Sequence, residues 1–304
     1  MALVTARGVA KSYGGHVALS GVDFDIEPGI TGLLGANGAG KTTMLGMIIG
    51  LHPRDSGTLE VLGHDPWSDG VTVRERLGYA PEHHTLPPDV RAADFVRHVA
   101  ELHGIPKAEA TTRASDALWL VELGEERFRP MGTMSTGQRQ RVKLAQAIAH
   151  DPGLVLLDEP TDGLDPVQRD VMLDLIKSVS TEYGINVILS SHLLAEVERI
   201  CTGVVIIGDG RTIASGPIDQ LRDPAARAVV VELDATEAEV EAVAADLRAA
   251  GVTVERDRRR LTMAGDDPAT YDRVVAVAVA RQVGIIRLGS SVSTLEDVFL
   301  GATG

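Results

Sequence analysis

The sequence is poor in cysteine and aromatic residues and has no long hydrophobic run. Its one cysteine, Cys201, excludes an internal disulfide and suits a reducing compartment. We interpret Cys201 as a small core residue rather than a nucleophile, because it lies at the edge of the apolar run 204–207. The longest uninterrupted apolar run, 274–280, is far below the roughly 20 residues that a membrane-spanning helix needs. Together with an N-terminus unlike a secretory signal, this predicts a soluble chain.

Positive charge is also scarce, since the formal net charge is -14 at pH 7 and the pI is about 5.1. A nucleic-acid footprint would need a basic stripe that dominates this background, so we expect no nucleic-acid partner. The only concentrated basic stretch, 256–260, is interrupted by Asp257 and lies between apolar alternations, which favours a solvated hairpin turn. The 304 residues suffice for one large or two modest domains.

The strongest motif fits G-x-x-x-x-G-K-[ST] and reads Gly35-Ala36-Asn37-Gly38-Ala39-Gly40-Lys41-Thr42-Thr43. It lies between an apolar run, 30–34, and a helix-forming run, 44–51, which is the strand-loop-helix context of a phosphate-binding loop. The glycines allow successive N–H groups to point into one concavity at the start of the helix. Lys41 can then reach the β- and γ-phosphates, and the Thr42 hydroxyl can ligate Mg²⁺. The alternative is a glycine-rich turn without chemistry.

Two carboxylates follow a second apolar run, 153–157, at the position where α/β proteins place their chemistry. Asp158 is suited to hold Mg²⁺ through its water shell, and Glu159 to polarise a water for attack on the γ-phosphate. Their alternative role is turn formation. His192 stands just past another predicted strand, 186–190, and as a neutral donor it could sense the γ-phosphate, although a lone histidine is usually structural.

Two further positions have a functional and a structural interpretation. Tyr13 is flanked by Ser12 and by two glycines, so we expect its ring on a loop, where it either stacks on a base or covers the sheet edge. Ser135 or Thr136 can cap a predicted helix that runs to His150, which leaves N-terminal N–H groups available to an anion. A simple capped helix is the alternative there.

The order of segments predicts two domains, 1–216 and 217–304. In the first, strands alternate with the phosphate loop and with a helical insertion of apolar residues at helical spacing, within a helical subdomain of about 83–150. The second has the order β-α-β-β-α-β, which suggests a small ferredoxin-like α+β domain. Its predicted strands are 228–233, 252–255, 261–263 and 285–288, and its helices are 236–251 and 267–281.

From residue 3 to about 216 the sequence resembles the nucleotide-binding subunits of ATP-binding cassette (ABC) transporters. The resemblance implies an α/β P-loop NTPase fold with an antiparallel β subdomain and a helical insertion. It assigns catalysis to Glu159, His192 and Lys41, and metal binding to Thr42, Glu82 and Asp158. It assigns nucleotide binding to Tyr13, Gly35, Asn37, Gly38, Ala39, Gly40, Lys41, Thr42, Thr43, Ser135, Gly137, Gln138 and Asp165.

Two positions depart from the family pattern. Glu82 stands where the family's Q-loop has glutamine, which alters a water-mediated contact to Mg²⁺ and the coupling to the transmembrane partner. The family's signature Leu-Ser-Gly-Gly-Gln is Met134-Ser135-Thr136-Gly137-Gln138 here, so that Thr136 adds a side chain where close approach to the phosphates is common.

The resemblance further implies an ATPase that binds MgATP, pairs head to tail with a second copy and drives a separate integral-membrane permease at the cytoplasmic face of the cell membrane. The groove near 82–96 is expected to receive a cytoplasmic helix of the permease. Segment 293–300 resembles the tail of daunorubicin-type exporters of drugs, antibiotics or polysaccharides. The alternatives are an ABC importer, or a non-transport ATPase acting on nucleic acid or ribosomes. The long coiled coils and fused second cassette of such non-transport ATPases are missing from the sequence.

Overall fold

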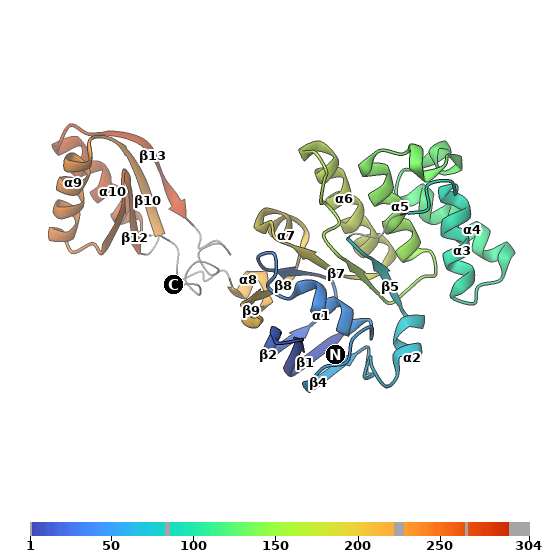
Figure 1. The fold of residues 1–304 in the computed structure, drawn as a ribbon. Coiled ribbons are helices and arrows are strands. Elements are labelled where there is room, and N and C mark those ends of the chain that lie inside the picture. The colour runs from blue at the N-terminus through green and yellow to red at the C-terminus, as the bar shows by residue number, and fades with distance from the viewer. Residues whose placement is uncertain (1, 83–85, 222–227, 265–266, 292–304) are drawn as a thin grey trace. The chain divides into compact units, whose positions relative to one another are not determined.

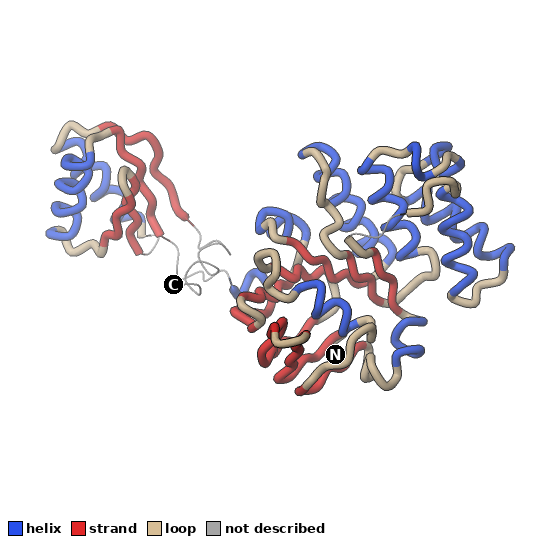
Figure 2. The backbone as a smooth tube through the Cα atoms, in the orientation of Figure 1, coloured by secondary structure: helices blue, strands red, loops and turns tan. Residues whose placement is uncertain are grey.

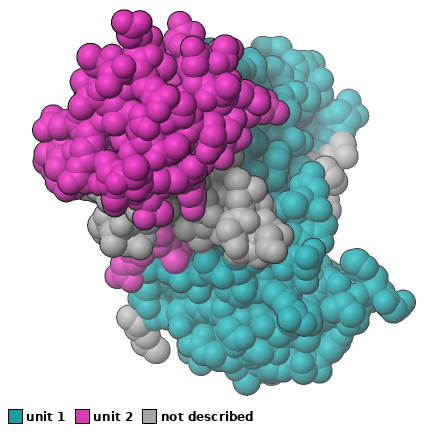
Figure 3. All heavy atoms as spheres, turned by 90° about the vertical axis from the view of Figure 1, so that its left-hand side faces the viewer, with its two compact units in different colours: residues 1–218 teal, residues 219–304 magenta. Residues whose placement is uncertain are grey.

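The computed structural model describes residues 2–82, 86–221, 228–264 and 267–291 (Figure 1). The chain divides into two compact units, residues 1–218 and 219–304, which are coloured separately in Figure 3. The exporter-like segment 293–300 lies outside the described residues. Within the described residues, no helix is both long and apolar enough to cross a membrane.

An antiparallel sheet with the strand order β2-β1-β4 opens the first unit. Its alternation of side chains follows the sequence, because Val22, Phe24 and Ile26 are buried while Asp23 and Asp25 between them are exposed. The sheet therefore covers the core with one face and meets solvent with the other. The strands are β1 (Val4–Tyr13), β2 (His16–Ile26) and β4 (Ser56–Val61).

The second sheet of this unit has six strands in the order β5-β6-β7-β3-β8-β9, of which β9 alone runs antiparallel to its neighbour. The carboxyl ends of β3, β6 and β7 therefore lie at the same edge, and the three predicted catalytic segments follow these strands. The strands are β5 (Leu77–Ala80), β6 (Leu154–Leu157), β7 (Asn186–Ser191), β3 (Ile30–Leu34), β8 (Gly203–Gly208) and β9 (Arg211–Pro217).

Both faces of this sheet are covered, as Figure 2 shows. In β6, Leu154 and Leu156 join the core that contains β1, β2 and α1, whereas Val155 and Leu157 join the core that contains α3 to α6. Burial on both sides explains the unbroken apolar run in this strand. The helices are α1 (Lys41–Ile48), α2 (Gly70–Glu75), α3 (Ala92–Leu102), α4 (Lys107–Leu120), α5 (Thr136–Ile148), α6 (Pro166–Tyr183), α7 (Leu194–Ile200) and α8 (Ile218–Leu221), with 3₁₀ turns η1 (Gly124–Phe128) and η2 (Met131–Thr133).

The second unit confirms the predicted β-α-β-β-α-β order, with a four-stranded antiparallel sheet β11-β12-β10-β13. It has a core of its own in which Val231, Leu247 and Leu261 are fully buried. The basic stretch forms the predicted hairpin turn, with Arg258 and Arg259 exposed between β11 and β12. The elements are β10 (Ala228–Asp234), α9 (Glu237–Ala249), β11 (Val254–Asp257), β12 (Arg260–Ala264), α10 (Pro268–Ala280) and β13 (Gly284–Ser291).

Several predicted boundaries are wrong. Tyr13 is the last residue of β1 and pairs with His16, because Gly14 and Gly15 both have positive φ and form a two-residue hairpin turn instead of a longer loop. Helix α1 begins at Lys41 rather than at 44, and it ends at Ile48 because Gly50 adopts a φ of 78°. Helix α5 ends at Ile148, two residues before the predicted His150.

Candidate active site

An open cleft of about 490 Å³ lies at the carboxyl edge of the six-stranded sheet. It brings together residues from the loop before α1, from the end of β1 and from the segments that follow β5, β6 and β7. The lining residues are Tyr13, His16, Ala18, Ala36, Asn37, Gly38, Gly40, Lys41, Thr42, Thr43, Glu82, Glu159, Asp162 and His192.

The loop from Gly35 to Gly40 packs closely against its surroundings. A Cβ on Gly35 would collide with the carbonyl oxygen of Ile207, and Gly40, with a φ of 106°, caps α1 in a left-handed conformation. The first backbone hydrogen bond of α1 runs from the Met44 N–H to the carbonyl oxygen of Gly40, at 2.9 Å. The N–H groups before Met44 consequently have no partner inside the helix and can bind an anion.

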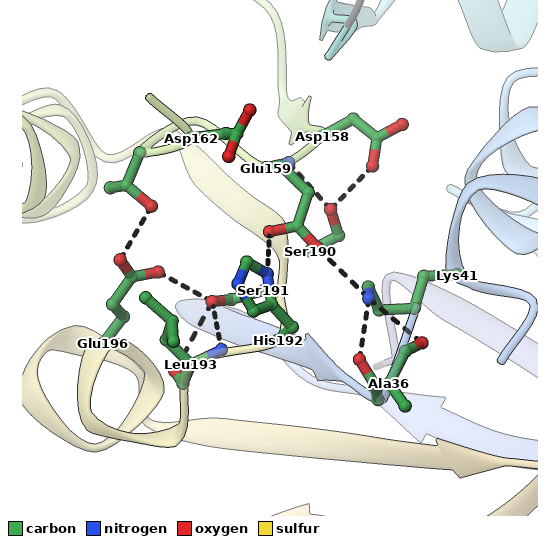
Figure 4. A network of polar contacts seen from close by, with 12 residues as sticks. Ala36, Lys41, Asp158, Glu159, Asp162, Ser190, Ser191, His192, Leu193 and Glu196 are labelled. Carbon is green, nitrogen blue, oxygen red and sulfur yellow. Dashed lines mark hydrogen bonds and ion pairs between the residues drawn. The ribbon is translucent and has the colours of Figure 1, made fainter. Parts of the chain in front are cut away.

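Lys41 is buried, with only 6% of its side chain exposed. Its Nζ donates to the Gly35 carbonyl oxygen at 2.7 Å and lies 3.1 Å from Oε1 of Glu159 (Figure 4). A buried ammonium requires such partners, because an unpaired charge is costly to remove from water. The loop thus holds one positive charge beside the first N–H groups of α1, which have no partner within the helix.

Glu159 connects Lys41 with His192. Its Oε1 pairs with Lys41, and its Oε2 lies 2.9 Å from Nδ1 of His192 (Figure 4). Among the described residues, Oε1 has no hydrogen-bond partner besides this ion pair, so it remains available to a proton donor. Glu159 also has a φ of 46°, which a non-glycine residue seldom adopts and which the surrounding contacts must hold in place.

Ser190 holds the two neighbouring carboxylate residues together. Its Oγ donates to Oδ1 of Asp158 at 2.6 Å and accepts the backbone N–H of Glu159 at 2.8 Å. Both Asp158 and Ser190 are buried. Ser190 was not among the predicted site residues; it becomes visible only through the parallel register that pairs Leu157 with Leu189 and so aligns the next residues of the two strands.

Tyr13 places a half-exposed aromatic ring at the mouth of the cleft. The ring forms a T-shaped contact with His52, with a centroid distance of 5.8 Å, and Nζ of Lys11 lies 5.3 Å from the ring centroid. Asp55 holds Lys11 through a 2.9 Å ion pair. A base stacked on the exposed part of this ring would add to the same cluster.

The predicted signature and D-loop residues are not among those that line this cleft. Ser135 caps α5 by accepting the Gln138 N–H at 3.2 Å, and the Gln138 side chain accepts the Ser135 N–H at 3.0 Å. Asp165 caps α6 by accepting the Gln168 N–H at 2.9 Å, while a Cβ on Gly137 would collide with Gln168. These residues thus form the N-termini of two other helices.

The oxygen ligands predicted for Mg²⁺ are Thr42, Asp158 and Glu82. Across the described ranges, no group of three or more His, Cys, Asp or Glu side chains could hold a metal by itself. This composition fits Mg²⁺, which binds through one or two carboxylates together with water and substrate phosphates. The chain's own residues would thus complete a magnesium site only with a polyphosphate beside the loop.

Burial perturbs two groups behind the cleft. It raises the pKa of Tyr79 to about 12, with the charges of Asp158 and Glu82 adding to the effect. It also lowers the pKa of Lys143, whose Nζ donates to the backbone oxygen of Glu82 at 2.6 Å. The backbone at Glu82 is therefore anchored to α5, so this cleft residue is linked to the helical subdomain.

The sequence and the fold of the first unit are similar to those of known proteins. A family model described as ABC transporter matches residues 19–162. A solved structure titled "Structure of ATP binding subunit of ABC transporter" is 29% identical, with a TM-score of 0.64, and covers 72% of this chain and 92% of its own.

Three curated relatives are similar over both units. The Nod factor export ATP-binding protein I of Cupriavidus metallidurans is 34% identical over 100% of this chain and 98% of its own length. The daunorubicin/doxorubicin resistance ATP-binding protein DrrA of Streptomyces peucetius is 32% identical over 99% and 92%, respectively. The methionine import ATP-binding protein MetN of Caulobacter vibrioides is 34% identical over 98% and 90%.

Proposed function

Because this chain belongs to the ATP-binding subunits of ABC transporters, we propose that it hydrolyses MgATP in the described cleft and powers a separate integral-membrane permease that exports its cargo. The observation that carries export is the similarity of the Nod factor export and drug resistance relatives over at least 99% of the chain, the second unit included. The cargo is then a drug, an antibiotic or another lipophilic or polymeric compound, and the chain works at the cytoplasmic face of the membrane through the permease.

The phosphates of ATP bind where the loop concentrates positive charge. The N–H groups at the start of α1 and Nζ of Lys41 face them, and Lys41 exchanges its contacts with Gly35 and Glu159 for phosphate oxygens. Thr42 and Asp158 would hold Mg²⁺, which would supply positive charge to neutralise the phosphates. The Tyr13 ring stacks on the adenine.

Glu159 acts as the general base. Once Lys41 turns to the phosphates, Oε1 is free to accept a proton from the attacking water, while Oε2 stays beside Nδ1 of His192. His192 orients the carboxylate and presents its other ring nitrogen to the γ-phosphate. The buried position of Glu159 limits competing contacts with solvent.

A second copy of the chain completes each site. Ser135, Gly137, Gln138 and Asp165 do not line their own cleft but form N-termini of α5 and α6, which are suited to phosphate oxygens brought by another copy. We assign these residues to the ATP of a partner in a head-to-tail dimer.

The shared site is tested by mixing two inactive chains. Lys41→Ala removes the charge facing the phosphates, and Ser135→Arg obstructs the surface offered to the partner's ATP. In a mixed head-to-tail dimer both lesions fall into one site and the other is intact, so mixing restores part of the ATPase activity. If each chain built its whole site alone, every site would carry one lesion, and verified mixed dimers would stay inactive.

The permease contacts the groove beside Glu82. A cavity of about 460 Å³ there lies between the segment after β5 and the start of α5, and Lys143 anchors the Glu82 backbone at its side. A cytoplasmic helix of the permease that docks against residues 82–96 of this chain would respond to structural changes at Glu82 and transmit them across the membrane. The glutamate in place of the family's glutamine brings one more negative charge to this junction.

Import is the second candidate, because the methionine import relative matches the same length of chain. Inside-out vesicles containing the permease and this chain distinguish the two directions. Export predicts that ATP added outside drives daunorubicin into the vesicles and that Glu159→Gln abolishes the accumulation. ATP-dependent release of methionine loaded into the vesicles would establish import instead.

A further inference from the structure

Glu196, in the first turn of α7, is a buried carboxylate that does not line the cleft. Only 3% of its side chain is exposed. Its Oε1 accepts a hydrogen bond from the Thr161 hydroxyl at 2.7 Å, and its Oε2 accepts one from the Ser191 hydroxyl at 2.7 Å. Nε of Arg169 lies 3.3 Å from Oε1. Figure 4 shows Glu196 beside Ser191, on the far side of the His192 segment from Lys41.

Fold stability alone does not explain a carboxylate at this place. Removing an ion from water costs several kcal/mol, and an apolar side chain of similar volume is often as stable as a buried ion pair. A carboxylate can connect two groups at a defined spacing, because it has two oxygens. Here each oxygen accepts a hydrogen bond from a hydroxyl of a different segment. Glu196 therefore fixes the distance between those two segments.

The two segments are those that carry the reacting pair. Thr161 follows Glu159 by two residues, and Ser191 directly precedes His192. The Ser191 hydroxyl also accepts the backbone N–H of Leu193 at 3.0 Å, so the residues on both sides of His192 are tied together. Arg169 adds α6, whose N-terminus is capped by Asp165.

We propose that Glu196 is a positioning residue that keeps Glu159 and His192 at hydrogen-bond distance during ATP hydrolysis; this inference rests on the proposed function. In the present arrangement Lys41 also holds Glu159, but the phosphates take over that contact when nucleotide binds. The Glu196 clamp, defined as Glu196 with Thr161 and Ser191, lies outside the cleft and survives the exchange. A misplacement of about 1 Å at a reacting group can cost roughly 10²-fold in rate, so a fixed pair matters.

The first test separates turnover from binding. Glu196→Gln keeps the shape but replaces one accepting oxygen by an NH2 group and removes the negative charge, so one hydroxyl must reverse from donor to acceptor and both hydrogen bonds lose their charge assistance, which weakens the tie between the two segments. We expect kcat to fall by about 10-fold or more, in line with such misplacement, and the Kd for ATP to stay within about twofold. An unchanged kcat, or a Kd that weakens by as much as kcat falls, would overturn the proposal.

Arg199→Gln is the matched control. Arg199 lies on the same helix and also connects α7 to α6, through ion pairs with Asp170 and Asp174, but all three side chains are at the surface. This variant loosens the two helices without touching Thr161 or Ser191, and kcat should remain unchanged. A loss of kcat equal to that of Glu196→Gln would assign the effect to helix packing and refute the clamp.

The second test asks whether Glu196 acts through Glu159. In a chain that already carries Glu159→Gln, adding Glu196→Gln should leave the residual rate unchanged, because the group being positioned is gone. If Glu196→Gln lowers the rate by the same factor in the Glu159→Gln background, Glu196 acts by another route and the proposal fails. Should Glu196→Gln not fold, Thr161→Val removes one of the two hydroxyls and is held to the same outcomes.

Assays of the unaltered chain distinguish failure of the proposed function from failure of the Glu196 clamp. If it binds ATP without hydrolysing it as a verified dimer, the proposed function fails and this inference with it. If it hydrolyses ATP and Glu196→Gln does so equally well, the clamp fails and the proposed function stands.

Discussion

The two units of this chain treat charge in opposite ways. Among the described residues of the first unit five charged side chains are buried, namely Lys41, Asp158, Glu159 and Glu196 at or beside the carboxyl edge of the sheet and Lys11 on β1. In the second unit the one buried polar residue within the described ranges is Thr270. The ion pairs there, such as Arg281 with Asp246 at 2.7 Å, lie at the surface.

This difference separates the chemistry from the scaffold. Buried charges cost stability unless partners surround them, so a cluster of them at one sheet edge indicates a site rather than a packing device. The second unit instead combines an apolar core with solvated charges, which is sufficient for folding, and its described residues include no buried charged side chain. We therefore expect substitutions of the buried charges at this sheet edge to change turnover, and substitutions in the second unit to change stability alone.

The largest effect should come from Glu159, the proposed general base. Glu159→Gln preserves the shape of the side chain and removes its proton acceptor, so turnover should fall by about 10² to 10⁴, roughly 3 to 5 kcal/mol in barrier. Binding of MgATP should persist, and the closed dimer should accumulate. Steady-state hydrolysis measures turnover, and size-exclusion chromatography with ATP measures the accumulation of the dimer.

Asp246→Asn is the matched control in the second unit, where it removes an exposed carboxylate paired with Arg281. Its turnover should equal that of the unaltered chain. A Glu159→Gln variant that hydrolyses ATP at close to the normal rate would remove Glu159 from its assigned role and erase the contrast between the units.

The core of the second unit gives the next effect. Leu261 is fully buried on β12, so Leu261→Ala should destabilise this unit by about 2 to 5 kcal/mol through lost burial and a cavity. Denaturant unfolding followed by a probe in each unit should show an earlier transition in the second unit, with ATP turnover unchanged under native conditions. If turnover fell while both units stayed folded, the second unit would take part in the chemistry.

The site could be predicted where the sequence carries a fixed spacing. The phosphate loop, the two carboxylates after β6 and the histidine after β7 follow strands whose apolar runs are visible in the sequence, and parallel strands bring such ends to one edge. The β-α-β-β-α-β order of the second unit was also predictable, because capping and turn residues separate its elements in the sequence.

Contacts between distant segments were not predictable in this way. Ser190 and Ser191 read as ordinary hydroxyls in a strand until the register places Ser190 beside Asp158. Glu196 offered one signal, because it shares the buried face of α7 with Val197 and Ile200. The strained φ of Glu159 has no signature in the residue type and depends on the contacts around it.

Lowering the pH should reduce the free energy of unfolding of the first unit and leave that of the second unchanged. This difference should be smaller than the effects above. Burial lowers the pKa of His150 to about 4, with His103 stacked on its ring at 3.6 Å and the positive Arg113 acting in the same direction. Nε2 lies 3.2 Å from the Leu77 oxygen, and Nδ1 has no partner among the described residues, so a second proton would be buried unpaired.

The sign follows from the lowered pKa. The unfolded chain binds a proton below the usual pKa of about 6.5 while the folded chain does not, so stability falls as the pH drops from 6.5 towards 4. With a folded pKa of about 4, the first unit should lose about 2 kcal/mol between pH 8 and pH 5. In His150→Phe, which keeps a stacked ring, this loss should shrink by about that amount.

The second unit should not respond over this range, because residues 219–304 contain no histidine. The arginine beside Asp246 lowers the pKa of that carboxyl, and the stability it contributes is lost only as the pH falls through the lowered value. Unfolding curves at pH 8, 6.5 and 5 check both units. An equal loss in both, or an unchanged slope in His150→Phe, would contradict the assignment to His150.

The smallest expected effect comes from removing the second unit altogether. A chain ending at residue 218 keeps every residue that lines the cleft, and the removed unit has its own core. The Kd for ATP, measured by titration calorimetry, should therefore stay within about twofold of that of the full chain, as no cleft contact is removed. A chain ending at residue 202 is the control, because it also loses β8, which pairs with β3 and supplies the Ile207 oxygen packed against Gly35. That shorter chain should not bind ATP, since the strand that carries the phosphate loop loses a neighbour. If the chain ending at 218 failed to fold or bind as well, the phosphate loop would depend on residues beyond the sheet, and the separation of chemistry from scaffold would fail.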